Sequence, residues 1–119
     1  VEAIPELKGK FDGIAIRVPT IDVSLCDFTF LVKKKTTVRA VQQAFRAAAR
    51  HSYYRTVLSV SDEPLVSTDL IGSTFSAVVD LPFIEVVDGD LVKVLAWYDN
   101  EWGYSHRLIE MAVEVGKAL

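Results

Sequence analysis

The chain has few cysteines and no excess of basic residues, the features on which disulfide-rich, zinc-binding and nucleic-acid-binding proteins depend. It contains a single cysteine, so no disulfide can form within it and a four-cysteine zinc site is excluded. Basic residues show no surplus, since 13 of them face 16 acidic residues and the formal net charge is -3. Proteins that bind a phosphate backbone normally carry a basic excess, so nucleic acid is not an expected partner.

Long apolar runs are missing as well. No stretch is long enough to span a bilayer and none has the form of a signal peptide, so we expect a soluble, cytoplasmic protein with no membrane partner. Half of the residues are nevertheless hydrophobic, which is ample for a core and argues against disorder. The two histidines, His51 and His106, lack the spacing of metal ligands, and no metal site is predicted.

Apolar residues recur at both strand and helix spacing. A period of two, or a continuous apolar run, predicts strands over residues 14–18, 23–33, 56–61, 74–80, 84–87 and 91–98. The last of these is the most apolar and is expected to be central and buried. Asp88-Gly89 predicts a hairpin turn just before it.

Two segments have helical spacing instead. The first begins near Val38 after a cap at Thr36 or Thr37, and the second runs to about Ala118 after a cap at Asp99 or Asn100. In the second helix the apolar face consists of Tyr104, Leu108, Met111, Ala112 and Val115. The pattern predicts an α+β fold with a largely antiparallel mixed sheet, one inserted helix and a C-terminal helix.

Cys26 is a weak candidate for a nucleophile. Its spacing places it on the same strand face as Phe28 and Phe30, where burial would raise the pKa of a thiol and suppress the thiolate. We interpret Cys26 as a core residue, and His51 and His106 as structural or solvated. The chain therefore offers no catalytic residue.

Two positions are better candidates for ligand contact. Arg17 interrupts an apolar strand beside the small residues Gly13 and Ala15, where a guanidinium has room to hold a phosphate; the alternative is a solvated surface arginine. Asn100 lies in the turn between the last strand and the last helix, where its amide is suited to another planar amide. The alternative for Asn100 is a simple helix cap.

The segments Arg17-Val18-Pro19-Thr20, residues 65–69 (LVSTD) and especially residues 97–105 (WYDNEWGYS) together resemble phosphorylating glyceraldehyde-3-phosphate dehydrogenase. The resemblance covers essentially the whole chain. It implies that residues 1–119 are the C-terminal part of the catalytic domain, including the C-terminal helix. By the same resemblance Arg17 binds substrate phosphate or inorganic phosphate, Asn100 fixes the nicotinamide carboxamide, and Tyr104 lies close to the nicotinamide ring.

The resemblance also implies what lies elsewhere in such an enzyme. The nucleotide-binding Rossmann domain, the Ser-Cys-Thr-Thr-Asn nucleophile segment and the catalytic histidine have no match here, so the isolated segment is predicted to be inactive. The complete enzyme is expected to be a homotetramer that uses NAD or NADP and inorganic phosphate to convert glyceraldehyde 3-phosphate to an acyl phosphate in glycolysis. Three alternatives remain open: a segment of erythrose-4-phosphate dehydrogenase, a catalytically dead paralogue, and a non-catalytic binding module of the same fold.

Overall fold

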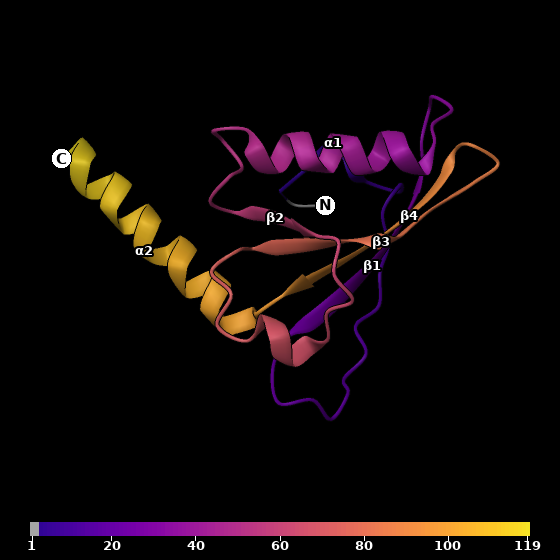
Figure 1. Ribbon diagram of the computed structural model, residues 1–119. Coiled ribbons are helices and arrows are strands. Elements are labelled where there is room, and N and C mark those ends of the chain that lie inside the picture. The colour runs from indigo at the N-terminus through magenta and orange to yellow at the C-terminus, as the bar shows by residue number, and fades with distance from the viewer. Residues whose placement is uncertain (1–2) are drawn as a thin grey trace.

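A four-stranded mixed sheet organises the computed structural model, which describes residues 3–119 (Figure 1). The elements are η1 (Pro5–Leu7), β1 (Ser24–Leu31), α1 (Val38–Arg50), β2 (Leu58–Ser61), η2 (Ser67–Leu70), β3 (Ala77–Val87), β4 (Leu91–Tyr98) and α2 (Asn100–Ala118). The strand order is β1-β4-β3-β2, with β4 antiparallel to both of its neighbours and β2 parallel to β3. This arrangement confirms the predicted α+β class and the largely antiparallel mixed sheet.

The core lies between α1 and one face of the sheet (Figure 1). β4 contributes three buried residues to it, Val92, Val94 and Ala96, as expected for a central strand. From α1, Val41 and Phe45 pack against the same cluster at helical spacing. The prediction of a central, buried last strand is therefore confirmed on this face.

Helix α1 begins where the sequence predicted it. Thr37 has an extended backbone, and its side-chain oxygen accepts a hydrogen bond from the backbone N–H of Ala40 at 3.2 Å. That bond satisfies one of the N–H groups that the first turn of a helix leaves without a partner. Of the two predicted caps, Thr36 and Thr37, the structure selects Thr37.

Strand β3 joins two segments that the sequence analysis predicted as separate strands. Its register against β4 shifts between Asp80 and Glu85, next to Pro82, which has no N–H to donate to a ladder. The hairpin that follows has Asp88 at φ 48° and Gly89 at φ 77°, the left-handed backbone that tight hairpin turns require. The Asp88-Gly89 hairpin prediction is confirmed, and the two predicted strands are one irregular strand.

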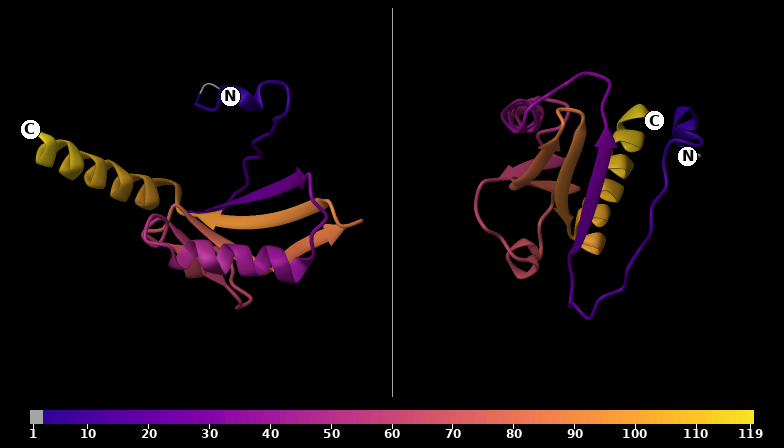
Figure 2. Two further views of the ribbon diagram at one scale, coloured as in Figure 1. Left: turned by 90° about the horizontal axis from the view of Figure 1, so that it is seen from above. Right: turned by 90° about the vertical axis from the view of Figure 1, so that its right-hand side faces the viewer.

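The predicted strand over residues 14–18 is wrong. This segment is extended but pairs with no strand in the described part of the chain, and Ile14 and Ile16 are 89% and 75% exposed. It lies on the side of the sheet opposite α1 (Figure 2). The physical reason is that a strand exists only through hydrogen bonds to a neighbouring strand, so an alternating pattern without a partner stays irregular.

Helix α2 projects from the end of the sheet instead of packing on it (Figures 1 and 2). Leu108, Met111 and Val115, three of the five residues of its predicted apolar face, are all exposed. The radius of gyration is 15.8 Å, larger than the roughly 13.5 Å typical of a compact domain of this length. The helix exists as predicted, but within residues 3–119 its apolar face is left uncovered. No helix of the described residues combines the length and the apolar character that a membrane span needs.

Candidate functional site

The candidate site lies where the end of β4, the start of β1 and the first turn of α2 meet. Asp99 connects these parts, because its Oδ1 accepts from the backbone N–H of Trp102 at 2.8 Å and its Oδ2 from that of Gly72 at 2.9 Å. The first bond caps α2, and the second ties the loop after η2 to the same turn. Asp99 is only 3% exposed, so this carboxylate is a structural anchor.

The surroundings of Asp99 favour its ionised form. Burial acts to raise the pKa of the Asp99 carboxyl, but hydrogen bonds from backbone N–H groups, those of Trp102 and Gly72 first, outweigh burial and hold the pKa below its ordinary value. The helix N-terminus also favours negative charge at this position. The negative charge of Asp99 therefore binds backbone N–H groups of the fold itself.

Because Asp99 caps the helix, the side chain of Asn100 is free for another role. Asn100 is exposed, and its Oδ1 accepts a hydrogen bond from Oγ of Ser24 at 2.9 Å. No residue in the range 3–119 accepts a hydrogen bond from its amide nitrogen, so both N–H donors of the amide are left without a partner in this part of the chain. Tyr104 follows four residues later on the same helix face and is 67% exposed. The structure thus brings two of the three predicted ligand residues, Asn100 and Tyr104, onto one face of α2.

Gly103 determines how closely α2 approaches the sheet. It is buried, and a Cβ atom at this position would lie 2.9 Å from the backbone oxygen of Phe75. Any side chain would push the first turn of α2 away from that loop. The glycine between Trp102 and Tyr104 therefore has a packing role.

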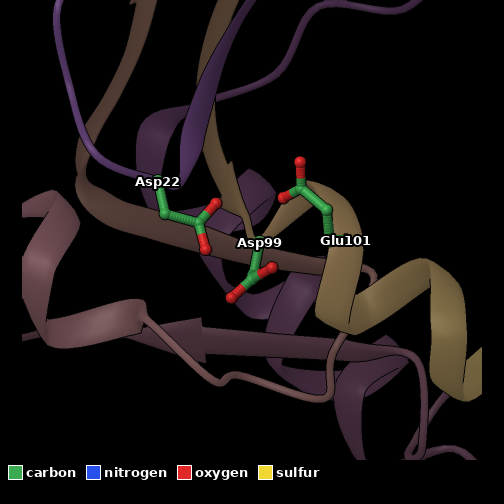
Figure 3. Close-up of side chains that lie close together, drawn as sticks. All are labelled: Asp22, Asp99 and Glu101. Atoms are coloured by element: carbon green, nitrogen blue, oxygen red, sulfur yellow. The ribbon is translucent and has the colours of Figure 1, made fainter.

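Three carboxylates gather beside this turn, from Asp22, Asp99 and Glu101, with oxygen atoms within 4.8 Å of one another. Figure 3 shows Asp22 in the loop before β1, facing Asp99 at the base of α2. Asp22 accepts from the N–H of Val23 at 2.6 Å, and both oxygens of Asp99 already bind backbone N–H groups. Two of the three carboxylates, Asp22 and Asp99, are therefore accounted for by backbone contacts.

Val23 has φ 69°, an unusual backbone for a β-branched residue. Its side chain is buried against Leu70 and Val78, and its N–H is bound by Asp22. These contacts hold a conformation that would otherwise be unfavourable by about 1–3 kcal/mol. The strained residue directly precedes Ser24, the hydroxyl partner of Asn100.

Arg17, the third predicted ligand residue, is not part of this group. It is exposed in the extended segment before β1, and no polar contact joins its side chain to a described residue. The structure therefore leaves the predicted phosphate contact of Arg17 untested. Its segment, residues 14–18, is the one whose strand did not form.

The three other candidate residues, one cysteine and two histidines, lie against other parts of the fold. Cys26 is half-buried on the α1 side of β1, less enclosed than predicted, opposite Ala96. His51 ends α1, where its Nδ1 accepts from the N–H of Tyr53 at 3.2 Å. His106 packs against Trp102, with ring centroids 5.7 Å apart.

The contact of Ser24 with Asn100 was not predicted from the sequence. No local pattern distinguishes this serine, which lies 76 residues from Asn100 along the chain, and only the pairing of Ser24 with Tyr98 brings them together. The one signal was indirect. A strand ends and a helix begins within residues 97–105, so a polar residue at the end of a neighbouring strand is a candidate partner for Asn100.

Comparisons with known proteins agree with this picture. The family model described as the C-terminal domain of glyceraldehyde 3-phosphate dehydrogenase matches residues 1–100. The chain is 49% identical over 116 residues to glyceraldehyde-3-phosphate dehydrogenase of Zymomonas mobilis, covering 98% of this chain and 34% of that protein. It is 47% identical over 112 residues to the enzyme of Geobacillus stearothermophilus, covering 94% and 33%.

A chloroplastic glyceraldehyde-3-phosphate dehydrogenase of Arabidopsis thaliana is 50% identical over 109 residues, covering 92% of this chain and 27% of that protein. The chain therefore spans about a third of the length of the relatives it matches. The matched family model covers most of the chain and includes Arg17 and Asn100. On these matches the chain belongs to the glyceraldehyde 3-phosphate dehydrogenase family, as a C-terminal segment of it.

Proposed function

We propose that this chain is the ligand-binding C-terminal part of a glycolytic dehydrogenase that oxidises glyceraldehyde 3-phosphate with NAD or NADP. The reaction joins the aldehyde and inorganic phosphate into an acyl phosphate, while the cofactor accepts a hydride and a proton is released. The observation that carries the proposal is the amide nitrogen of Asn100, which is left free at the start of α2 because Asp99 supplies the cap. Similarity to named dehydrogenases supports the same reaction.

Asn100 and Tyr104 form the part of the cofactor site that this chain contributes. The amide of Asn100 fits the carboxamide of a nicotinamide, because each group offers a donor and an acceptor in one plane. Tyr104 supplies an aromatic surface one helical turn away. Holding the carboxamide fixes which ring face meets the substrate, and this orientation is what the protein contributes to hydride transfer.

Arg17 is proposed to bind the phosphate of the substrate or inorganic phosphate. A guanidinium binds phosphate oxygens in a bidentate geometry and stays charged at any working pH. The exposed position of Arg17, with no carboxylate partner among the described residues, leaves it available for an anion.

The nucleophile, the general base and the nucleotide-binding domain are proposed to come from the other two thirds of the subunit, so the chain alone is expected to be inactive. The apolar residues exposed on α2 and in residues 14–18 fit contacts with that remainder. The complete enzyme is proposed to be a cytoplasmic homotetramer.

The test is an assay of the full-length protein that contains this chain. Phosphate-dependent reduction of NAD or NADP is followed by absorbance, with glyceraldehyde 3-phosphate and erythrose 4-phosphate compared as substrates. Higher kcat/KM for glyceraldehyde 3-phosphate supports the proposal, and a preference for erythrose 4-phosphate assigns the chain to the related enzyme. Absence of reduction with either aldehyde would favour a non-catalytic module.

A further inference from the structure

The orientation of the Asn100 amide depends on a residue from a distant part of the chain. Oγ of Ser24 lies 2.9 Å from Oδ1 of Asn100, with the hydroxyl donating and the amide oxygen accepting. An asparagine amide presents an oxygen on one side and an NH₂ group on the other, and turning it over exchanges the two. In the structure the Ser24 hydroxyl donates to Oδ1, and in this orientation the NH₂ group faces away from β1.

Both partners in this contact are held in place independently. Ser24 is the first residue of β1 and pairs with Tyr98 in the antiparallel ladder. The residue before it, Val23, is anchored by its buried side chain and by the carboxylate of Asp22. On the other side, Asp99 holds the backbone turn from which Asn100 projects. The hydroxyl and the amide therefore meet through fixed backbone positions.

We propose that Ser24 is a positioning residue for the cofactor site. Its hydroxyl orients the Asn100 amide so that NH₂ is presented to the carboxamide oxygen of the nicotinamide. This inference rests on the proposed function, since it assumes that Asn100 contacts the cofactor. It goes further by making the start of β1 part of the cofactor site, although Ser24 itself touches neither cofactor nor substrate.

The contact predicts a specific pattern of cofactor affinity in the full-length protein. Isothermal titration with the oxidised cofactor, without substrate, measures the dissociation constant directly. Ser24→Ala is expected to weaken binding about five-fold, the effect of one ordinary hydrogen bond. Ser24→Thr keeps a hydroxyl and is expected to bind within about two-fold of the parent. Thr29→Val, which removes a hydroxyl from the exposed part of the same strand, is the matched control and should leave affinity unchanged.

A double-mutant cycle separates positioning from a general effect on the fold. Asn100→Ala is expected to weaken binding by about ten-fold or more, and Ser24→Ala should add nothing in that background because there is no amide left to orient. Equal losses from Ser24→Ala in both backgrounds would overturn the positioning role. If Asn100→Ala weakens binding and Ser24→Ala does not, this inference fails while the proposed function stands. If Asn100→Ala has no effect, the proposed cofactor contact itself is wrong.

The 119-residue chain offers a second readout that needs no cofactor. In its NMR spectrum, the two side-chain NH₂ signals of Asn100 should shift in Ser24→Ala and stay in place in Ser24→Thr and Thr29→Val. Unchanged Asn100 signals in Ser24→Ala would show that the hydroxyl does not hold the amide, and would overturn the proposal.

Discussion

Trp97 and Asp80 form a buried hydrogen bond between β4 and β3: Nε1 of the indole donates to Oδ2 of the carboxylate across 3.0 Å. Asp80 is 1% exposed, and its second oxygen has no partner among residues 3–119. A buried carboxylate with a single donor is costly unless that donor stays in place. The pair therefore links two central strands just before the turn that carries Asn100.

Removing the indole donor of Trp97 should lower the free energy of unfolding more than replacing the Asp80 carboxylate with an amide. Trp97→Phe leaves the Asp80 carboxylate without its indole partner and is expected to lower the free energy of unfolding by about 3 kcal/mol. Asp80→Asn keeps an acceptor for the indole, so we expect a clearly smaller loss. Urea denaturation of both variants and of the double variant measures the difference. A larger loss for Asp80→Asn than for Trp97→Phe would contradict this account.

The Asp99 cap should make stability depend on pH. The pKa of the folded carboxyl lies below its ordinary value of 3.8, so its contribution is present above that value and is lost as the pH falls through the folded pKa. Asp99→Asn keeps only one acceptor for the two backbone N–H groups, and we expect it to cost about 1–2 kcal/mol at pH 7.

Denaturation at pH 7 and pH 3 tests the sign of this effect. The difference in the free energy of unfolding between the parent and Asp99→Asn should narrow at pH 3, which lies below the ordinary value of 3.8. There the unfolded chain takes up a proton that the folded carboxyl, with its lowered pKa, resists. Asp12→Asn is the control, since this exposed carboxylate binds only the N–H of neighbouring Gly13. If the difference in the free energy of unfolding between the parent and Asp99→Asn is the same at both pH values, the ionised form of Asp99 is not what stabilises the turn.

Two glycines of α2 should respond in opposite directions to alanine. At Gly103 the added Cβ meets the Phe75 oxygen at 2.9 Å, so Gly103→Ala is expected to lower stability by about 2 kcal/mol. At Gly116 nothing lies within 4 Å of the added atom, so Gly116→Ala should raise helix stability by up to about 1 kcal/mol. Thermal unfolding followed by circular dichroism compares them, and a stabilised Gly103→Ala would show that α2 does not sit against this loop.

The phosphate contact proposed for Arg17 is testable on the chain alone. In a heteronuclear NMR titration with inorganic phosphate, signals around Arg17 should shift and saturate, and Arg17→Ala should abolish the response. Arg39→Ala, which removes an exposed arginine of α1, should leave the response intact. Well-dispersed signals that do not move with phosphate would mean that the site needs residues from the rest of the enzyme, or that Arg17 is a surface arginine.

The exposed apolar residues of α2 should make the isolated chain associate. Leu108 and Met111 are more than half exposed, and replacing both with lysine is expected to shift the chain toward monomer. Glu114→Lys on the polar face is the matched control, because either change moves the formal net charge from -3 to -1. Light scattering across a concentration series measures the mass, and a parent chain that stays monomeric at high concentration would refute the expectation.

Local patterns in the sequence were enough for much of the fold. The nearly continuous apolar run over residues 91–98 predicted β4, the helical spacing after Thr37 predicted α1, and Asp88-Gly89 predicted the hairpin. Each of these signals involves residues close together in the chain, where periodicity and turn chemistry act directly. The WYDNEWGYS turn likewise pointed to the family through residues that are contiguous.

The tertiary structure decided what depends on partners far apart in sequence. It left residues 14–18 without a neighbouring strand, assigned the helix cap to Asp99, and brought Ser24 to Asn100 across 76 positions. A side chain's pattern shows what it is able to bind, but strand register and burial determine which group it meets. For that reason the amide of Asn100 was identifiable from sequence, whereas its orientation became visible only in the folded chain.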